Sequence, residues 1–276
     1  MFIDVHTHVS TKEQWVSYQK KSNGQVAKII SLAWCYKDSP TEPDVERLLK
    51  FVATESNIYV AGSINMDEGF GQQLKRHEEL FQQKKIVAIK LYPGYQHFYP
   101  YEGRVTAIAE LCARYNKPLI FHSGDFYDVH GTALLEYARS IHIDQLARRC
   151  PNTKIVISHF GFPHFLDTAG IVSQHDHVYT DISGTIDDSG LTTKELTALI
   201  EQYIADLRRV FNYYPNIKNK IMFGTDFVGE ETPLKHVEPY RRVIQSLFNK
   251  REQASAFHEL AEKLYFAEMK KHSATA

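Results

Sequence analysis

The chain has 276 residues, 43% of them hydrophobic, and a formal net charge of −1 from 32 basic and 33 acidic side chains. This length and apolar content suffice for one large core, which favours a single domain over residues 1–276. Because the charges balance and no long run of one sign occurs, the composition favours neither nucleic acid nor a membrane surface as a partner.

The cysteines and the apolar runs indicate where the protein resides. Cys35, Cys112 and Cys150 form no close pair and leave an odd count, which is typical of a reducing compartment. No apolar stretch approaches the length of a membrane span, and the chain opens on an apolar run without room for a signal peptide. We therefore expect a cytoplasmic protein. The sequence leaves open whether it forms a homo-oligomer.

Short apolar runs recur along the chain, and helical patterns separate them. Residues 45–52 carry apolar side chains at three- and four-residue spacing, as a helix packed on a sheet does. Residues 192–195 have the Thr-x-x-Glu sequence of a capping box, which predicts the start of another helix. The predicted strands are 2–8, 27–34, 58–65, 86–92, 119–122, 155–159, 178–182 and 221–226.

Strict alternation of strands and helices predicts a parallel sheet of the α/β class. Eight strands in this length favour a closed (β/α)8 TIM barrel over an open doubly wound sheet. The open sheet has less support because no glycine-rich dinucleotide-binding turn follows any of the runs. We expect one TIM-barrel domain, with a polar, frayed tail from Lys270 onward.

The first apolar run ends in His6-Thr7-His8, the most informative pattern in the chain. Residues two apart on a strand point to the same side, so both imidazoles converge on one spot. Such a pair at the carboxyl end of a strand supplies the first two nitrogen ligands of a divalent metal site. A surface strand that exposes two histidines would have the same local sequence.

Further polar residues lie where later runs end, namely Lys90, His122, His159 and Asp226. In a TIM barrel the carboxyl ends of the strands meet at the mouth, where the chemistry collects. A single histidine on an apolar strand is usually a packed core residue, but this whole group is hard to explain as packing. Unpaired, each buried side chain would cost on the order of a few kcal/mol, which a shared cation would remove.

These residues resemble the amidohydrolase superfamily, and within it the amidohydrolase-related branch of metal-dependent hydrolases and non-oxidative decarboxylases. The resemblance covers nearly the whole chain, and it implies a TIM-barrel enzyme with a divalent metal ion. Its most specific motifs are Asp4-Val5-His6-Thr7-His8, Ile89-Lys90-Leu91-Tyr92-Pro93, His122, His159-Phe160-Gly161 and Phe223-Gly224-Thr225-Asp226.

Carried over by position, the resemblance makes His6, His8, His122 and Asp226 the ligands of one divalent ion. Zn²⁺ is the preferred ion, and Mn²⁺ or Fe²⁺ would suit the same ligand types. The resemblance also implies that Asp226 takes the proton of a metal-bound water that attacks a carbonyl. His159 would orient or protonate the substrate, or bind a second metal if the centre is binuclear.

Lys90 has three interpretations. We favour an unmodified lysine that pairs with a substrate carboxylate, and therefore one metal. In binuclear relatives a lysine in this region becomes a carbamate that bridges two metals, which requires a pKa well below roughly 10.4. The third interpretation is a salt bridge with Asp4 or another acid inside the barrel. Asp4 has the strand phase of His6 and His8, and we expect it to support the metal ligands.

Aromatic side chains crowd residues 92–101 and also follow the fifth and sixth predicted strands. Loops after strands line the mouth of a barrel, so these rings indicate an apolar-walled pocket for a small-molecule substrate. Tyr92, two residues beyond Lys90, is the aromatic residue that we expect to contact the substrate. No basic cluster occurs in these loops, which argues against a phosphorylated substrate.

Two enzyme functions are compatible with this set of residues. We favour a hydrolase of a small amide, lactone or ester, and the alternative is a decarboxylase of an aromatic or unsaturated carboxylic acid. A TatD-type nuclease ranks lower, because that family has a glutamate where this chain has Lys90 and because the net charge is near zero. A non-catalytic barrel has no support, since no member of the expected ligand set is missing.

Overall fold

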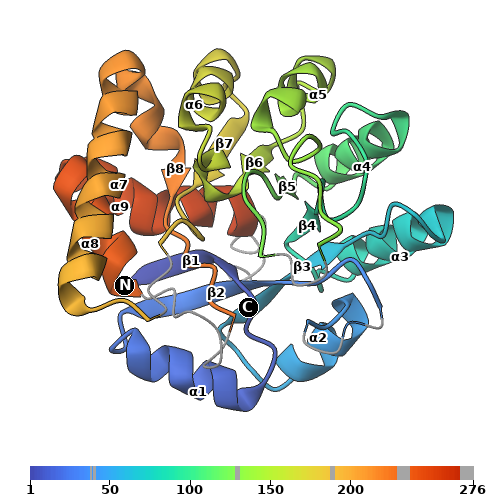
Figure 1. The fold of residues 1–276 in the computed structure, drawn as a ribbon. Coiled ribbons are helices and arrows are strands. Elements are labelled where there is room, and N and C mark those ends of the chain that lie inside the picture. The colour runs from blue at the N-terminus through green and yellow to red at the C-terminus, as the bar shows by residue number, and fades with distance from the viewer. Residues whose placement is uncertain (38, 40–41, 128–130, 187–189, 229–236, 268–276) are drawn as a thin grey trace.

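Eight strands form one sheet around the centre of the molecule, and helices surround it (Figure 1). The computed structural model describes residues 1–37, 39, 42–127, 131–186, 190–228 and 237–267, so the predicted frayed tail lies outside the described residues. Neighbouring strands are parallel throughout. The strands are β1 (Phe2–Thr7), β2 (Val26–Leu32), β3 (Ile58–Ser63), β4 (Ala88–Leu91), β5 (Leu119–Phe121), β6 (Ile155–Ile157), β7 (Val178–Asp181) and β8 (Ile221–Met222).

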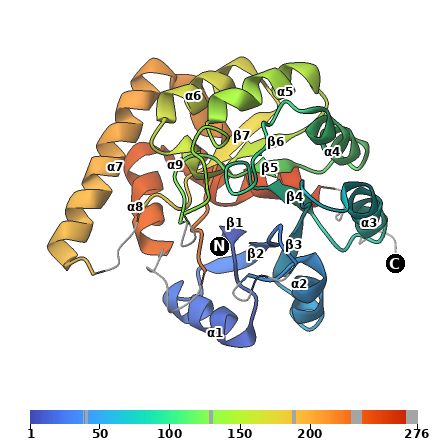
Figure 2. The same cartoon turned by 45° about the vertical axis from the view of Figure 1, so that its right-hand side comes forward.

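Helices connect each strand to the next, two more follow the last strand, and they lie outside the sheet (Figure 2). The predicted capping box is present, because Glu195 N donates to the Thr192 hydroxyl and Thr192 N donates to the Glu195 carboxylate. Within the described residues, no helix is both long enough and apolar enough to cross a bilayer. The helices are α1 (Lys12–Lys21), α2 (Val45–Val52), α3 (Phe70–Gln82), α4 (Gly103–Arg114), α5 (Ile143–Arg149), α6 (Phe165–Gln174), α7 (Thr193–Tyr213), α8 (Val237–Leu247) and α9 (Lys250–Ala254).

Backbone hydrogen bonds close the sheet between β8 and β1. Val5 N donates to Phe223 O at 3.2 Å, and Asp226 N donates to His6 O at 2.7 Å. The last strand of the barrel therefore pairs with the first. The predicted (β/α)8 TIM barrel in one domain is confirmed.

The hydrophobic core has two layers, one inside the barrel and one between the sheet and the helices. The C-terminal segment packs against the inner layer through residues such as Leu264 and Tyr265. Lys117 lies two residues before β5, and its Nζ donates to Tyr265 O at 3.0 Å. The C-terminal segment thus covers the amino ends of the strands, and the carboxyl ends remain as the mouth.

Asp4 joins β1 to the segment after β8 and to α1. Its carboxylate accepts hydrogen bonds from His6 N at 3.1 Å, Thr225 N at 3.1 Å, Thr225 Oγ1 at 2.6 Å and the Tyr18 hydroxyl at 2.6 Å. Tyr18 belongs to α1, so Asp4 points to the helix side of the sheet. The expectation that Asp4 shares the strand phase of His6 is wrong, because the β1 register shifts between Asp4 and Thr7.

We expect Asp4→Ala to lower the free energy of unfolding by at least about 2 kcal/mol, because it leaves two buried backbone N–H groups, those of His6 and Thr225, without an acceptor. Asp4→Asn is the matched control. Its amide oxygen can still accept from the two backbone donors, and its NH₂ group can donate to the Tyr18 and Thr225 hydroxyls. Urea denaturation of both variants measures the difference. Equal losses would contradict the role assigned to these hydrogen bonds.

Candidate metal centre and active site

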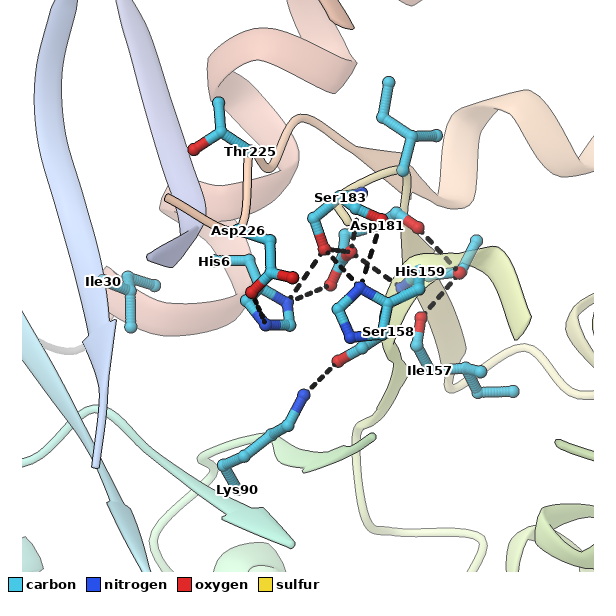
Figure 3. Close-up of polar contacts among 12 residues, drawn as sticks. His6, Ile30, Lys90, Ile157, Ser158, His159, Asp181, Ser183, Thr225 and Asp226 are labelled. Atoms are coloured by element: carbon cyan, nitrogen blue, oxygen red, sulfur yellow. Dashed lines mark hydrogen bonds and ion pairs between the residues drawn. The ribbon is translucent and has the colours of Figure 1, made fainter. Parts of the chain in front are cut away.

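The ends of β1 and β8 bring three metal-donor groups together at the barrel mouth. Asp226 Oδ1 lies 3.3 Å from His6 Nε2 and 3.3 Å from His8 Nε2. The ligand atoms of these three residues all lie within 4.8 Å of one another. Figure 3 shows the carboxylate of Asp226 directed at the ring of His6. Two nitrogens and one carboxylate oxygen are the donors that zinc prefers.

Asp226 reaches this position through an unusual backbone conformation. Its φ is +62°, in the left-handed region that residues with a Cβ atom seldom adopt, although aspartate tolerates it better than most. The hydrogen bond from Asp226 N to His6 O and the bonds from Thr225 to Asp4 hold the turn. Strained backbone of this kind collects at functional sites, where the surrounding structure maintains it.

Asp181, at the end of β7, lies on the other edge of the His6 ring. Its Oδ2 is 3.2 Å from His6 Nδ1, and its Oδ1 accepts from His159 N and from Ser183 N, each at 3.1 Å. Burial opposes its ionisation, but the adjacent His6 ring, through electrostatic attraction and its hydrogen bond, holds the pKa of Asp181 well below its usual value. Sequence reasoning missed Asp181, although an acid at the end of the seventh predicted strand is a signal of the kind used for Asp226.

Asp181 fixes the protonation of the His6 ring. An ionised carboxylate can only accept, so the shared proton lies on His6 Nδ1 and the lone pair on Nε2 points toward His8 and Asp226. Burial, and then the charge of Lys90, lower the pKa of His6 and keep the imidazole neutral. A neutral ring with a free Nε2 lone pair is the form that binds a metal.

His122 follows β5 and faces the same region. Its ring centroid lies 5.0 Å from that of His159, but His122 is not among the three residues whose donor atoms meet within 4.8 Å. Its Nε2 is buried and makes no hydrogen bond with any described residue. Burial, together with the positive charge of neighbouring residues, lowers the pKa of His122 well below its usual value. A buried lone pair without a partner fits a fourth metal ligand.

His159 lies in the turn Ser158–Gly161 that follows β6, again with a positive φ, of 60°. Its Nδ1 is 3.1 Å from the carbonyl oxygen of Ser183, which assigns the ring proton to Nδ1 and a lone pair to Nε2. Burial lowers the pKa of His159 to about 3, so the ring is neutral. A Cβ atom at Gly184 would lie 2.5 Å from His159 Nδ1 and 2.7 Å from Asp226 Oδ2, so these two side chains flank Gly184 closely.

His6, His159 and Asp181 form a second group of possible donors. The Ser183 hydroxyl lies in the middle of this group, 3.1 Å from His6 Nδ1, 3.0 Å from His159 Nδ1 and 2.5 Å from Asp181 Oδ1. These donor atoms already share hydrogen bonds with the hydroxyl. The first group is therefore the better candidate for a cation site, and the second would be its supporting hydrogen-bond network (Figure 3).

Lys90 points from β4 into the barrel and is fully buried. Its Nζ donates to Ser158 Oγ at 2.5 Å (Figure 3). The interpretation as a salt bridge with Asp4 is wrong, because Asp4 points to the helix side and bonds other groups there. Burial lowers the pKa of Lys90 to about 8, although the charges of Asp181 and Asp226 raise it.

Tyr92 is buried beside Lys90, with the lysine Nζ 5.5 Å from the centre of the phenol ring. Its hydroxyl donates to Ala33 O at 2.9 Å. The ring therefore borders the interior of the site, but the hydroxyl is bonded to the backbone after β2. The predicted contact of Tyr92 with substrate stays a prediction.

The chain belongs to the amidohydrolase family, whose sequence profile matches residues 3–267. Comparison with curated proteins gives no match. An uncharacterised TIM-barrel protein of Bordetella bronchiseptica is similar, with a TM-score of 0.71 and 14% identity over 95% of this chain and 97% of that chain. An amidohydrolase of Burkholderia multivorans with bound zinc has a TM-score of 0.65 and 14% identity over 96% and 99%. A dihydroxybenzoic acid decarboxylase of Polaromonas with bound manganese and an inhibitor has a TM-score of 0.63 and 12% identity over 97% of each chain.

We expect His6→Ala to abolish metal binding, because the substitution removes one nitrogen donor and the ring that pairs with Asp181 Oδ2. The metal content of the purified protein, measured by plasma mass spectrometry, should fall from about one ion per chain to none. His177→Ala is the control, since that ring is bonded to Ala147 O. Stoichiometric metal in the His6 variant would contradict the ligand assignment.

Proposed function

We propose that this protein is a metal-dependent hydrolase that adds water to the carbonyl of a small amide, lactone or ester. The placement of the Asp226 carboxylate is the observation that supports this proposal. Its Oδ1 lies 3.3 Å from Nε2 of both His6 and His8, whereas its Oδ2 and His159 both border Gly184. The Asp226 carboxylate thus lies against the proposed metal donors with one oxygen and on the side of the neutral His159 with the other. The second oxygen can therefore take up a proton.

The metal would be held by His6, His8 and Asp226, with His122 as a fourth donor. Nitrogen and carboxylate donors suit Zn²⁺, and Mn²⁺ or Fe²⁺ are the alternatives. The zinc and the manganese in two structural neighbours agree with this choice. When bound, the ion supplies positive charge that polarises a carbonyl and lowers the pKa of water.

The chain's own groups would handle the protons of the reaction. Asp226 takes one proton from the water as the water oxygen adds to the carbonyl carbon. The bond to the leaving nitrogen or oxygen then breaks, and Asp226 returns the proton to that atom. His159 accepts a hydrogen bond at Nε2, since its Nδ1 is bonded to Ser183 O, and so orients the water or the intermediate.

We expect His159→Asn to retain about one metal ion per chain but to lower kcat by about 10² or more. The asparagine removes the Nε2 acceptor without touching the three clustered donors. Turnover of a panel of lactones, esters and amides, measured beside metal content, tests both parts. A rate near that of the wild type would exclude His159 from the reaction.

A decarboxylase of an aromatic carboxylic acid is the second candidate. The rings of Tyr95 and Phe126 lie 5.0 Å and 5.3 Å from the ring of His122. Aromatic walls close to a buried lysine suit an aromatic carboxylate, and one structural neighbour is a decarboxylase of dihydroxybenzoic acid. Release of CO₂ without uptake of ¹⁸O from labelled water into the product would favour this candidate over the hydrolase.

We expect Lys90→Met to raise the KM for a carboxylate substrate by about tenfold or more, because a charge-assisted hydrogen bond is lost. The KM for an uncharged ester or lactone should change little, which provides the internal control. Lys90→Arg keeps the positive charge but cannot form a carbamate. If native protein holds a second metal that Lys90→Arg lacks, the unmodified lysine and the one-metal centre are both excluded.

The class of partner and the location of the protein in the cell are proposals as well. A small-molecule substrate and a cytoplasmic location remain part of the proposal. The three cysteines are unpaired and buried, in keeping with a reducing compartment. The nuclease alternative gains no support, since β4 carries Lys90 where that family has a glutamate.

A further inference from the structure

The second ring nitrogen of His8 is close to a carboxylate but is not hydrogen-bonded to it. His8 Nδ1 makes no hydrogen bond with any of the residues that the structure describes, although the side chain is only 8% exposed. Its Nε2 lies 3.3 Å from Asp226 Oδ1, among the proposed metal donors. A neutral imidazole carries one proton, so a metal at Nε2 leaves that proton on Nδ1. His8 then needs an acceptor at Nδ1, because a buried donor without one weakens the site.

Glu42 is the carboxylate beside this nitrogen, with Oε1 3.6 Å from His8 Nδ1. It lies between β2 and α2, in a segment tied to the barrel by the hydrogen bond from Trp34 N to Pro43 O at 2.9 Å. Its side chain is 28% exposed. A charge-assisted hydrogen bond is about 2.7–2.9 Å long, so Glu42 must approach by less than about 1 Å.

We propose that Glu42 is a positioning residue of the metal centre, which accepts the Nδ1 proton of His8 when a divalent ion is bound at Nε2. This inference rests on the proposed metal-dependent function. The same arrangement exists at the other histidine of the pair, since His6 Nδ1 lies 3.2 Å from Asp181 Oδ2. Metal-bound histidines commonly donate their second N–H to a carboxylate, which fixes the ring and raises its basicity.

The two carboxylates differ in where they come from. Asp181 ends a strand of the barrel and is 1% exposed, so it orients His6 before any ion arrives. Glu42 belongs to a connection outside the strands and stands just beyond hydrogen-bonding distance of His8. We therefore expect the hydrogen bond from His8 Nδ1 to Glu42 to form when the metal binds.

The test is zinc binding by purified full-length protein, measured by competition with a chromophoric chelator. We expect Glu42→Ala to raise the Kd for zinc by about 10- to 100-fold. Glu42→Gln should raise it less, because the amide oxygen still accepts a hydrogen bond. Glu46→Gln is the matched control, with the same charge change on α2 at a residue bonded to Arg76, and its Kd should equal that of the wild type.

A second readout separates positioning from a merely structural role. In the ¹H–¹⁵N NMR spectrum of zinc-loaded protein, the Nδ1–H of His8 should give a signal protected from exchange, which Glu42→Ala loses. The thermal midpoint of the metal-free protein should be the same in the wild type and both Glu42 variants. Equal zinc affinity in Glu42→Ala and the wild type would overturn the role of Glu42 alone. A wild-type protein that binds no divalent ion would instead overturn the proposed function.

Discussion

The seam between β8 and β1 is the constraint on which the rest of the site depends. It joins the two ends of the barrel, and the hydrogen bond from Asp226 N to His6 O spans it at 2.7 Å. Asp4 reinforces the seam, since one carboxylate accepts from the backbone of His6 and of Thr225, which are far apart in sequence. Because the same bonds close the barrel and set the spacing of two proposed metal donors, fold stability and site geometry are coupled.

Charge balance inside the barrel follows from this arrangement. Burial favours the neutral forms of His6 and His159, as their lowered pKa values indicate. The charged groups are then Asp181 and Asp226, opposed by Lys90, which sum to an excess of one negative charge while the lysine is protonated. A single divalent ion would turn this excess into one positive charge, whereas two ions would leave a large uncompensated positive charge in a buried site. This balance is the electrostatic reason for proposing one ion and not two.

Local sequence patterns were enough to predict the barrel and the pair of His6 and His8, since alternating apolar runs and helical repeats define eight strands and place both histidines at the end of the first. Asp226 and His122 entered the proposed ligand set through the family resemblance. The phase of Asp4 could not be predicted, because a one-residue shift in β1 depends on pairing with β2. Glu42 was also inaccessible to sequence reasoning, since its approach to His8 depends on the path of a connection outside the barrel.

The donor set does not by itself choose between hydrolysis and decarboxylation, so the choice depends on the wall of the mouth. That wall is built by connections after the strands. Tyr95, after β4, contacts the rings of His122 and Phe126. A Cβ atom at Gly94 would lie 2.3 Å from Phe126 Cζ, and the φ of Gly94 is +99°, so this position accommodates little other than glycine. The backbone at Gly94 thus fixes an aromatic ring beside a proposed ligand. We therefore expect reaction specificity to depend on loop packing around Lys90 and His122 more than on the proposed metal donors.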